Sequence, residues 1–243
     1  MQDEHMKVHV FCDFDGTITK KDSGDEFFKQ FSDFEPYHTQ LMDGLLTVTS
    51  YYNEVVQKLK HSMDEQAIRN FADACETDMY FPQFVSLIIS FGWHLHIVSD
   101  GFKTYIEPIL QRILPNNSIN VFSNNIISPL SSLNPTQDWK AHYPFADESC
   151  TCFCASCKRN IVLSSVHPDA LIIYIGDGLS DTCPVTFADM VFAKGKLAAF
   201  CNTNGILHHS WHTFFDIITV LKKRKPVKRD IAKKNRQKAF EQE

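Results

Sequence analysis

Two aspartates, Asp13 and Asp15, directly follow the apolar run Val10-Phe11-Cys12. Residues two apart on an extended chain begin on the same side, so these carboxylates start close together. At ~4 Å and an effective dielectric constant of ~20, two such charges repel by roughly 4 kcal/mol. A divalent cation removes this repulsion, and Mg²⁺ binds one or two carboxylates together with phosphate oxygens. The pair therefore favours magnesium-assisted phosphate chemistry.

Two further polar clusters stand at the ends of runs that predict strands. Ser99-Asp100-Gly101 closes the run 94–98, and Gly176-Asp177-Gly178 closes the run 170–175, with Asp181 shortly after. In open α/β sheets, ligands bind beyond the carboxyl ends of the strands. We therefore expect all three clusters to meet at one edge of a sheet.

Together these segments resemble the four motifs of the haloacid dehalogenase superfamily, whose members are mostly Mg²⁺-dependent phosphatases. The chain has DxDGT from Asp13, a strand-terminal Ser99, Lys158 at the start of a helix and GDxxxD at Asp177 and Asp181, in the superfamily's order. The resemblance implies hydrolysis of a phosphate ester through an aspartyl-phosphate. Covalent catalysis of this kind splits one difficult displacement into two easier ones.

The same resemblance implies a role for each motif residue. Asp13 is the expected nucleophile, and Asp15 protonates the leaving oxygen and then activates water. Ser99 and nearby backbone N–H groups hold the phosphate, with Gly101 in support, and Lys158 neutralises charge. The expected magnesium ligands are Asp13, Asp177 and the main-chain carbonyl of Asp15, while Asp181 orients Lys158 or a metal-bound water.

Several of these residues also have ordinary structural interpretations. Ser99 could cap a strand end, Lys158 could be a solvated helix residue, and Asp181 could be an acid favoured by a helix dipole. The occurrence of all the motifs at successive strand ends favours the catalytic interpretation.

Strand and helix patterns alternate along most of the 243 residues, which predicts a doubly wound α/β parallel sheet with a Rossmann-like core. Helices are expected at 105–114, 158–166 and 180–188. Residues 20–92 show only helical spacing, which is too long for a plain crossover, so we expect an inserted helical cap. The predicted parts are a catalytic core (1–19 and 93–221), the cap (20–92), an irregular cysteine-containing insertion (124–157) and a basic tail (222–243).

The subgroup with such a cap includes phosphoserine phosphatases. Within it the chain most resembles methionine-salvage phosphatases that act on hydroxyketo-methylthiopentenyl phosphate, through segments such as 122–125 and 188–194. Phosphoserine phosphatases have a glutamate nine residues after the nucleophile, where this chain has Asp22. The resemblance implies a small phosphorylated metabolite as substrate, with phosphoserine, pyridoxal phosphate or thiamine phosphate as alternatives. Substrate contacts are expected from Asp22, Ser23 and Phe27.

Four closely spaced cysteines precede Lys158. Four thiolates can bind Zn²⁺ tetrahedrally, although the close spacing is unusual for such a site. Structural zinc, reduced thiols and a disulfide all remain open for this group, which comprises Cys150, Cys152, Cys154 and Cys157.

Charge is distributed unevenly, because residues 222–243 hold ten Lys or Arg against three Asp or Glu in a chain of net charge −5. The tail resembles a nuclear-import signal or a contact for nucleic acid or another polyanion, but a solvated tail is the simpler interpretation. A non-enzymatic binding module acting through this tail is the contrasting functional class. With no secretory signal and no apolar run long enough for a membrane, we expect a cytoplasmic protein without a membrane partner.

Overall fold

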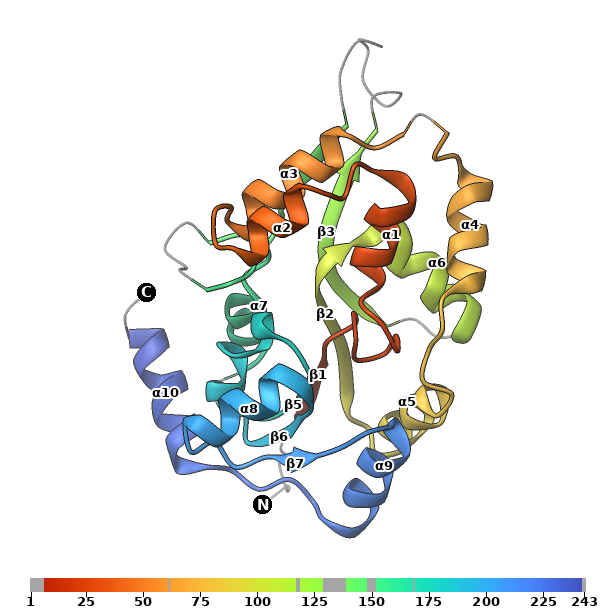
Figure 1. The fold of residues 1–243 in the computed structure, drawn as a ribbon. Coiled ribbons are helices and arrows are strands. Elements are labelled where there is room, and N and C mark those ends of the chain that lie inside the picture. The colour runs from red at the N-terminus through yellow and green to blue at the C-terminus, as the bar shows by residue number, and fades with distance from the viewer. Residues whose placement is uncertain are drawn as a thin grey trace.

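The computed structural model describes residues 7–60, 62–116, 119–128, 139–147, 152–167 and 169–241. Its centre is a seven-stranded sheet of order β4-β3-β2-β1-β5-β6-β7 (Figure 1), in which only β3 and β4 pair antiparallel. The predicted doubly wound α/β fold is therefore confirmed. The strands are β1 (Val8–Cys12), β2 (His94–Phe102), β3 (Asn120–Ile127), β4 (Lys140–His142), β5 (Leu171–Gly176), β6 (Met190–Ala193) and β7 (His209–Ser210).

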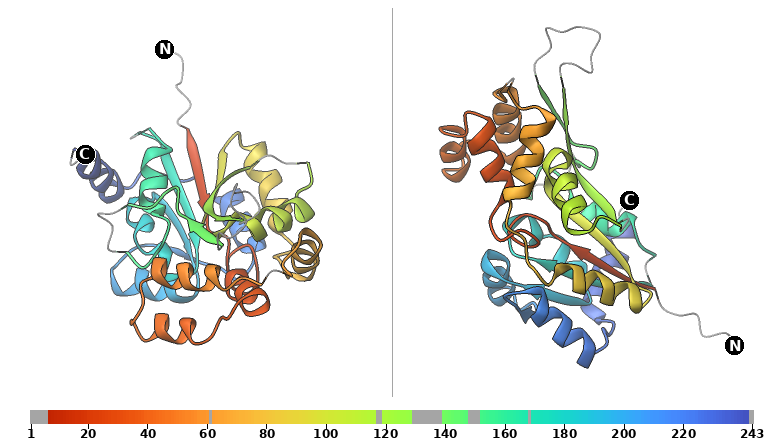
Figure 2. Two further views of the ribbon diagram at one scale, coloured as in Figure 1. Left: turned by 90° about the horizontal axis from the view of Figure 1, so that it is seen from above. Right: turned by 90° about the vertical axis from the view of Figure 1, so that its right-hand side faces the viewer.

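The central strands are apolar because helices cover both faces of the sheet, as expected for parallel strands. Val10, Ile173 and their neighbours on one face pack against α5, α6 and α9. Phe11 and Tyr174 on the other face pack against α7 and α8. Figure 2 shows these two helical layers around the sheet. The covering helices are α5 (Phe81–Ser90), α6 (Lys103–Ile113), α7 (Lys158–Ser164), α8 (Gly195–Thr203) and α9 (Phe214–Lys223).

Four helices form a cap over the carboxyl ends of the strands (Figure 1): α1 (Ser23–Phe31), α2 (Tyr37–Met42), α3 (Val48–Gln57) and α4 (Glu65–Ala74). Three of them begin at side chains that accept a backbone N–H of the first turn, namely Asp22, Thr47 and Asp64. The chain leaves the core at Thr19 and returns at Thr77, and these two residues form an antiparallel β-bridge.

Helix α5, within the range predicted for the cap, packs on the core. The rings of Phe81 and Phe84 each lie 4.9 Å from the ring of Phe214 in α9. We therefore place the cap at residues 20–76, with α5 as part of the core.

The predicted helix at 180–188 is wrong. The structure has two short 3₁₀ helices there, η2 (Leu179–Asp181) and η3 (Pro184–Phe187). Pro184 has no N–H for a helical hydrogen bond. The carboxylate of Asp181 instead accepts the backbone N–H groups of Asp177 and Gly178, which folds this segment back on itself.

The insertion predicted at 124–157 contains regular structure. Strand β3 continues to Ile127 and pairs with β4 through Ile126 and Ala141. Tyr143, just after β4, donates its hydroxyl to the carbonyl of Thr49 (3.2 Å) and to Oδ1 of Asn53 (2.9 Å). The segment that follows β4 therefore contacts α3 of the cap.

The basic tail is folded over most of its length. Helix α9 extends into it as far as Lys223, and α10 (Asp230–Glu241) packs against η3. Arg236 of α10 is 1% exposed, unlike the solvated residues that the sequence alone suggests. None of the helices in the described part of the chain is long and apolar enough to cross a membrane.

Candidate active site

Lys158, the first residue of α7, lies between two carboxylates at the centre of the site. Its Nζ donates to Oδ1 of Asp13 (2.6 Å) and to Oδ1 of Asp181 (2.7 Å), and the side chain is 1% exposed. Burial lowers the pKa of Lys158, but the two carboxylates raise it by more, so the net shift is upward. Lys158 is therefore a fixed positive charge beside the expected nucleophile, and the solvated alternative does not hold.

Asp181 positions Lys158 and the backbone of its own loop. Its Oδ1 also accepts the hydroxyl of Tyr174 (2.7 Å), and its Oδ2 accepts the N–H groups of Asp177 and Gly178 at 3.0 Å each. The carboxylate can approach this closely because residue 176 is glycine: a Cβ there would lie 2.4 Å from Oδ2 of Asp181. Four donors occupy the two oxygens, which leaves Asp181 poorly suited to bind a metal.

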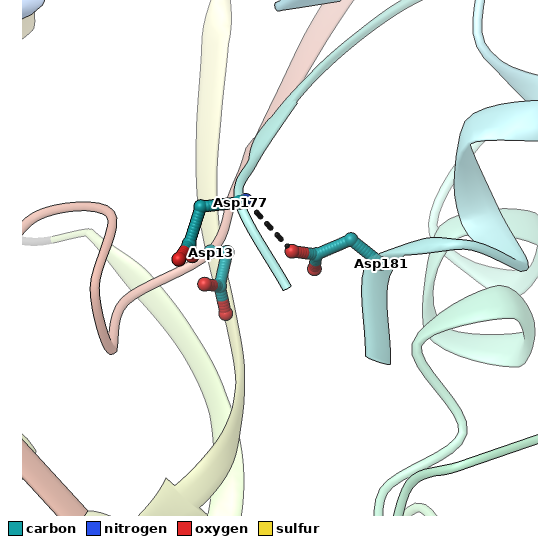
Figure 3. A group of neighbouring side chains, drawn as sticks. All are labelled: Asp13, Asp177 and Asp181. Carbon is teal, nitrogen blue, oxygen red and sulfur yellow. Dashed lines mark hydrogen bonds between the residues drawn. The ribbon is translucent and has the colours of Figure 1, made fainter. Parts of the chain in front are cut away.

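Asp13 and Asp177 form the acidic pair that suits a divalent cation. Their carboxylate oxygens, with those of Asp181, lie within 4.8 Å of one another. In Figure 3 the carboxylates of Asp13 and Asp177 lie close together, while that of Asp181 bonds to the backbone of Asp177. Thr17 holds Asp177 by donating its hydroxyl to Oδ1 (2.9 Å). Burial, then the charge of Asp181, raises the pKa of Asp177, while the hydrogen bond from Thr17 and the charges of Lys194 and Lys158 oppose this shift.

The pKa of Asp13 is raised by the same two causes as that of Asp177. Burial, then the carboxylate of Asp181, raises its pKa, and Lys158 opposes this shift. Hard carboxylate oxygens at this spacing are a suitable donor set for Mg²⁺. The predicted metal ligands Asp13 and Asp177 are therefore together, with Asp15 two residues from the first of them.

Asp15 is enclosed by three hydroxyl groups. Ser23 of α1 donates to its Oδ1, while Ser99 (2.9 Å) and Tyr105 (3.4 Å) donate to its Oδ2. Burial, then the charge of Asp22, raises the pKa of Asp15 to about 7, although the hydrogen bonds from Ser23 and Ser99 pull it down. A carboxyl group with such a pKa can both give and take a proton near neutrality.

Ser99 and Gly101 act together at the end of β2. The N–H of Gly101 donates to Oγ of Ser99 (2.9 Å), which fixes the hydroxyl beside Asp15. A Cβ at position 101 would lie 1.9 Å from the Tyr105 hydroxyl and 2.7 Å from Oδ2 of Asp15. The backbone can pass this close to Asp15 only with glycine at that position.

Asp100 is a site residue to which sequence reasoning gave no role. Its carboxylate accepts the backbone N–H groups of Ala155 (2.8 Å) and Ser156 (2.6 Å), two residues before Lys158. Burial raises the pKa of Asp100 to about 6, against the opposing charge of Lys158. The end of β2 thus anchors the segment that delivers Lys158.

The sequence analysis also gave no role to Tyr174, whose hydroxyl bonds to Asp181, because this residue lies within the apolar run of β5. One signal was available, since a tyrosine buried in a central strand usually needs a partner for its hydroxyl.

A cavity of about 380 Å³ opens from the acidic site toward the cap. Asp13, Asp15 and Asp177 line its floor, and its cap wall is acidic, aromatic and apolar, with Asp22, Asp25, His38, Leu41, Met42, Val48, Tyr51 and Tyr52. A second cavity of about 610 Å³ shares Asp15, Asp22 and Asp177 and extends to Lys194 and Trp211, whose ring lies 3.9 Å from Nζ of Lys194.

The three expected substrate contacts have different surroundings. Asp22 lines both cavities. Ser23 is buried and donates its hydroxyl to Asp15, so it lies beside this carboxylate and not in the cap wall. Phe27 is fully buried, packed against the rings of Phe28, Phe31, Phe71 and Tyr105. Phe27 lines neither cavity, because its ring belongs to the aromatic core between α1, α4 and α6.

Zinc binding by the cysteine group finds no support among the described residues. Within the described residues, the three aspartates are the one group of His, Cys, Asp or Glu side chains spaced to hold a metal ion. Cys157 donates its backbone N–H to the carbonyl of Phe145 (2.9 Å). Cys154 donates its backbone N–H to the carbonyl of Cys152 (2.9 Å). Cys150 lies outside the described residues, so the complete cysteine group is not tested.

Curated relatives match this chain over most of its length. A 2-hydroxy-3-keto-5-methylthiopentenyl-1-phosphate phosphatase of Exiguobacterium is 31% identical over 223 residues, which is 89% of this chain and 98% of the relative. The protein of that name from Bacillus cereus strain 03BB102 is 27% identical, over 89% of this chain and 97% of its own.

Solved structures share the fold. A structure described as a phospho-aspartyl intermediate analogue of phosphoserine phosphatase superposes with a TM-score of 0.63 at 15% identity, covering 90% of this chain and all of that one. A probable phosphoserine phosphatase from Vibrio cholerae superposes with a TM-score of 0.64 at 18% identity, covering 96% of this chain and 67% of that one.

The fold, together with the relatives, defines a phosphoric monoester hydrolase of the haloacid dehalogenase superfamily. Within that class the chain belongs to the family described as Putative Phosphatase, whose model matches residues 8–198.

Proposed function

We propose that this phosphatase hydrolyses a small phosphorylated metabolite in two steps, through an aspartyl-phosphate on Asp13. The contact of Lys158 with Asp13 and Asp181 is the main observation behind the proposal. It holds the nucleophile in a buried site and supplies a fixed positive charge where a phosphoryl group would arrive. With Oδ1 of Asp13 engaged by Lys158, Oδ2 is the oxygen left for attack.

In the first step, Oδ2 of Asp13 attacks phosphorus and the bond from phosphorus to the ester oxygen breaks. Asp15, protonated at this stage, gives its proton to the departing alcohol. The pKa of about 7 for Asp15 suits this role. Ser99, fixed by Gly101, is close enough to Asp15 to hold a phosphate oxygen beside it.

In the second step, Asp15 takes a proton from water while the water oxygen attacks phosphorus. The bond between phosphorus and Asp13 breaks, which releases inorganic phosphate and restores both carboxyl groups. Asp13, Asp177 and the main-chain carbonyl of Asp15 would hold Mg²⁺, which supplies positive charge to the phosphate oxygens. Lys158 and Asp181 keep their positions through both steps.

We propose hydroxyketo-methylthiopentenyl phosphate as the first substrate to test, because the relatives that cover almost the whole chain carry that name. A cavity of about 380 Å³ fits a molecule of that size. Phosphoserine, pyridoxal phosphate and thiamine phosphate are the alternatives. Asp22 and Asp25 in the cap wall would suit those that carry a positive charge.

The test is release of phosphate from these four esters with Mg²⁺, with excess chelator, and by the variant Asp13→Asn. An amide is a poor nucleophile and a poor magnesium ligand, so we expect turnover only by the wild type with metal. Asp73→Asn, on the exposed surface of α4, is the matched control and should retain full activity. Turnover that survives both chelator and Asp13→Asn would refute the mechanism, and no turnover on any ester would favour the binding-module class.

A further inference from the structure

Arg236 of α10 forms a buried ion pair with Asp189, just before β6. Its Nη1 lies 3.1 Å from Oδ2 of Asp189 and its Nη2 lies 3.4 Å from Oδ1. The arginine is 1% exposed and the aspartate side chain is fully buried. An isolated buried charge is strongly unfavourable, so each residue depends on the other.

Asp189 also connects α10 to β5. Its Oδ2 accepts the N–H of Ile172 (2.9 Å), and its own N–H donates to the carbonyl of Ile172 (2.8 Å). Its Oδ1 accepts the N–H of Arg229, at the approach to α10 (3.0 Å). One carboxylate therefore joins the start of the strand that carries Asp177 to the beginning and the middle of the terminal helix.

Helix α10 holds η3 as well. Nη1 of Arg236 donates to the carbonyl of Phe187 (2.5 Å), and Nδ2 of Asn235 donates to the carbonyl of Thr186 (2.8 Å). Short 3₁₀ helices leave terminal carbonyls that need outside donors. The segment 177–189, which carries Asp177 and Asp181 at one end, is thus fixed at its other end by α10.

We propose that Arg236 is a positioning residue for the phosphatase reaction, acting through segment 177–189 on Asp181 and Lys158. The proposal rests on the function proposed above for those two residues. A guanidinium satisfies Asp189 and the Phe187 carbonyl together, whereas an ammonium is a single point of contact. The basic tail thereby belongs to the catalytic core through one buried side chain, whatever its exposed lysines bind.

The experiment compares the full-length variants Arg236→Gln and Lys234→Gln. Both remove one positive charge from α10, but Lys234 is exposed. The measurements are kcat and KM for an ester that the wild type hydrolyses, the folded fraction by circular dichroism, and hydrogen exchange of the segments 177–189 and 81–90. For Arg236→Gln we expect a loss of about tenfold in kcat with little change in KM, because a small displacement of catalytic groups slows the reaction.

Faster exchange should accompany that loss in 177–189 but not in 81–90, and Lys234→Gln should match the wild type in both measurements. A wild-type kcat per folded molecule for Arg236→Gln, or unchanged exchange in 177–189, would overturn the proposal. If Arg236→Gln does not fold, the variant Arg236→Lys tests the proposal through the same measurements of kcat and of hydrogen exchange in 177–189. If the wild type hydrolyses no ester, the proposed function fails, while the exchange data still report whether Arg236 orders segment 177–189.

Discussion

The hydroxyl of Tyr174 donates a 2.7 Å hydrogen bond to Oδ1 of Asp181, the same oxygen that accepts Nζ of Lys158. A side chain in the middle of β5 therefore helps to orient the carboxylate that holds Lys158. Burial, followed by the charge of Asp181, raises the pKa of Tyr174 well above its usual value. Tyr174 thus stays a proton donor at every pH at which the enzyme would work.

Asp181→Asn should be far more damaging than Tyr174→Phe. The amide places an NH₂ group among four donors, so we expect kcat to fall about 100-fold as Lys158 loses its position. Tyr174→Phe removes one hydrogen bond, worth about 1 kcal/mol, so a loss of tenfold or less is expected. Steady-state kinetics on both variants checks the order. Equal rates for Asp181→Asn and the wild type would contradict the role given to Asp181.

Ser23→Ala should move the alkaline limb of the pH profile upward. In the proposed mechanism Asp15 is protonated in the first step, so kcat/KM should fall as pH rises through its pKa of about 7. Ser23 lowers this pKa by donating to the carboxylate, and its loss should raise it. Profiles of kcat/KM from pH 5 to 9 measure the shift. Ser23→Thr, which keeps the hydroxyl, is the control, and a downward shift in Ser23→Ala would disprove the assignment.

His96→Phe should flatten the acid dependence of stability. Nδ1 of His9 lies 3.0 Å from Nε2 of His96, and burial, followed by nearby histidines, lowers the pKa of each to about 4. An unfolded histidine titrates near 6.5, so the unfolded chain binds more protons below that pH. The stability contributed by neutral His9 and His96 is therefore present above about pH 6.5 and is lost as the pH falls toward 4.

Urea unfolding at pH 7, 5.5 and 4.5 measures this effect as the difference between wild type and variant. Other groups that titrate in this range cancel in that difference. An equal loss of stability with acid in both proteins would show that these histidines do not contribute.

Asp22→Ala should change the order of preferred substrates. Asp22 lines both cavities and also caps α1 by accepting the N–H of Asp25 (2.9 Å). Alanine removes both functions, with a loss of about 1 kcal/mol in stability from the cap. Asp22→Ser keeps a capping oxygen and removes the charge. We expect both variants to change the ranking of the esters and only Asp22→Ala to lose stability. An unchanged ranking in both would remove Asp22 from the substrate site.

The parts of the site that the sequence predicts lie at strand ends. Asp13, Ser99 and Asp177 each follow an apolar run, and the parallel order of the strands brings them to one edge. Lys158 could be assigned to the site because it is the first residue of a predicted helix. These inferences depend on local patterns and on a rule that holds for every sheet of this kind.

The remaining contacts depend on residues far apart in the chain. Arg236 reaches Asp189 across 47 positions, and in sequence it looks like one of many solvated basic residues. The predicted helix at 180–188 is wrong for a local reason, because Pro184 lies inside it and has no N–H for a helical hydrogen bond. The spacing of apolar residues does not show this interruption, although the proline itself is visible in the sequence.

The bridge between Thr19 and Thr77 joins the two crossings between core and cap at one point. A unit attached by adjacent strands can be lengthened, shortened or exchanged without altering the order of the sheet. Ser23 lies only four residues beyond this junction, however, and its hydroxyl contacts Asp15. A transplanted cap would therefore need to bring its own hydroxyl donor at this place, so a chimaera made here should keep residues 20–23 with the core.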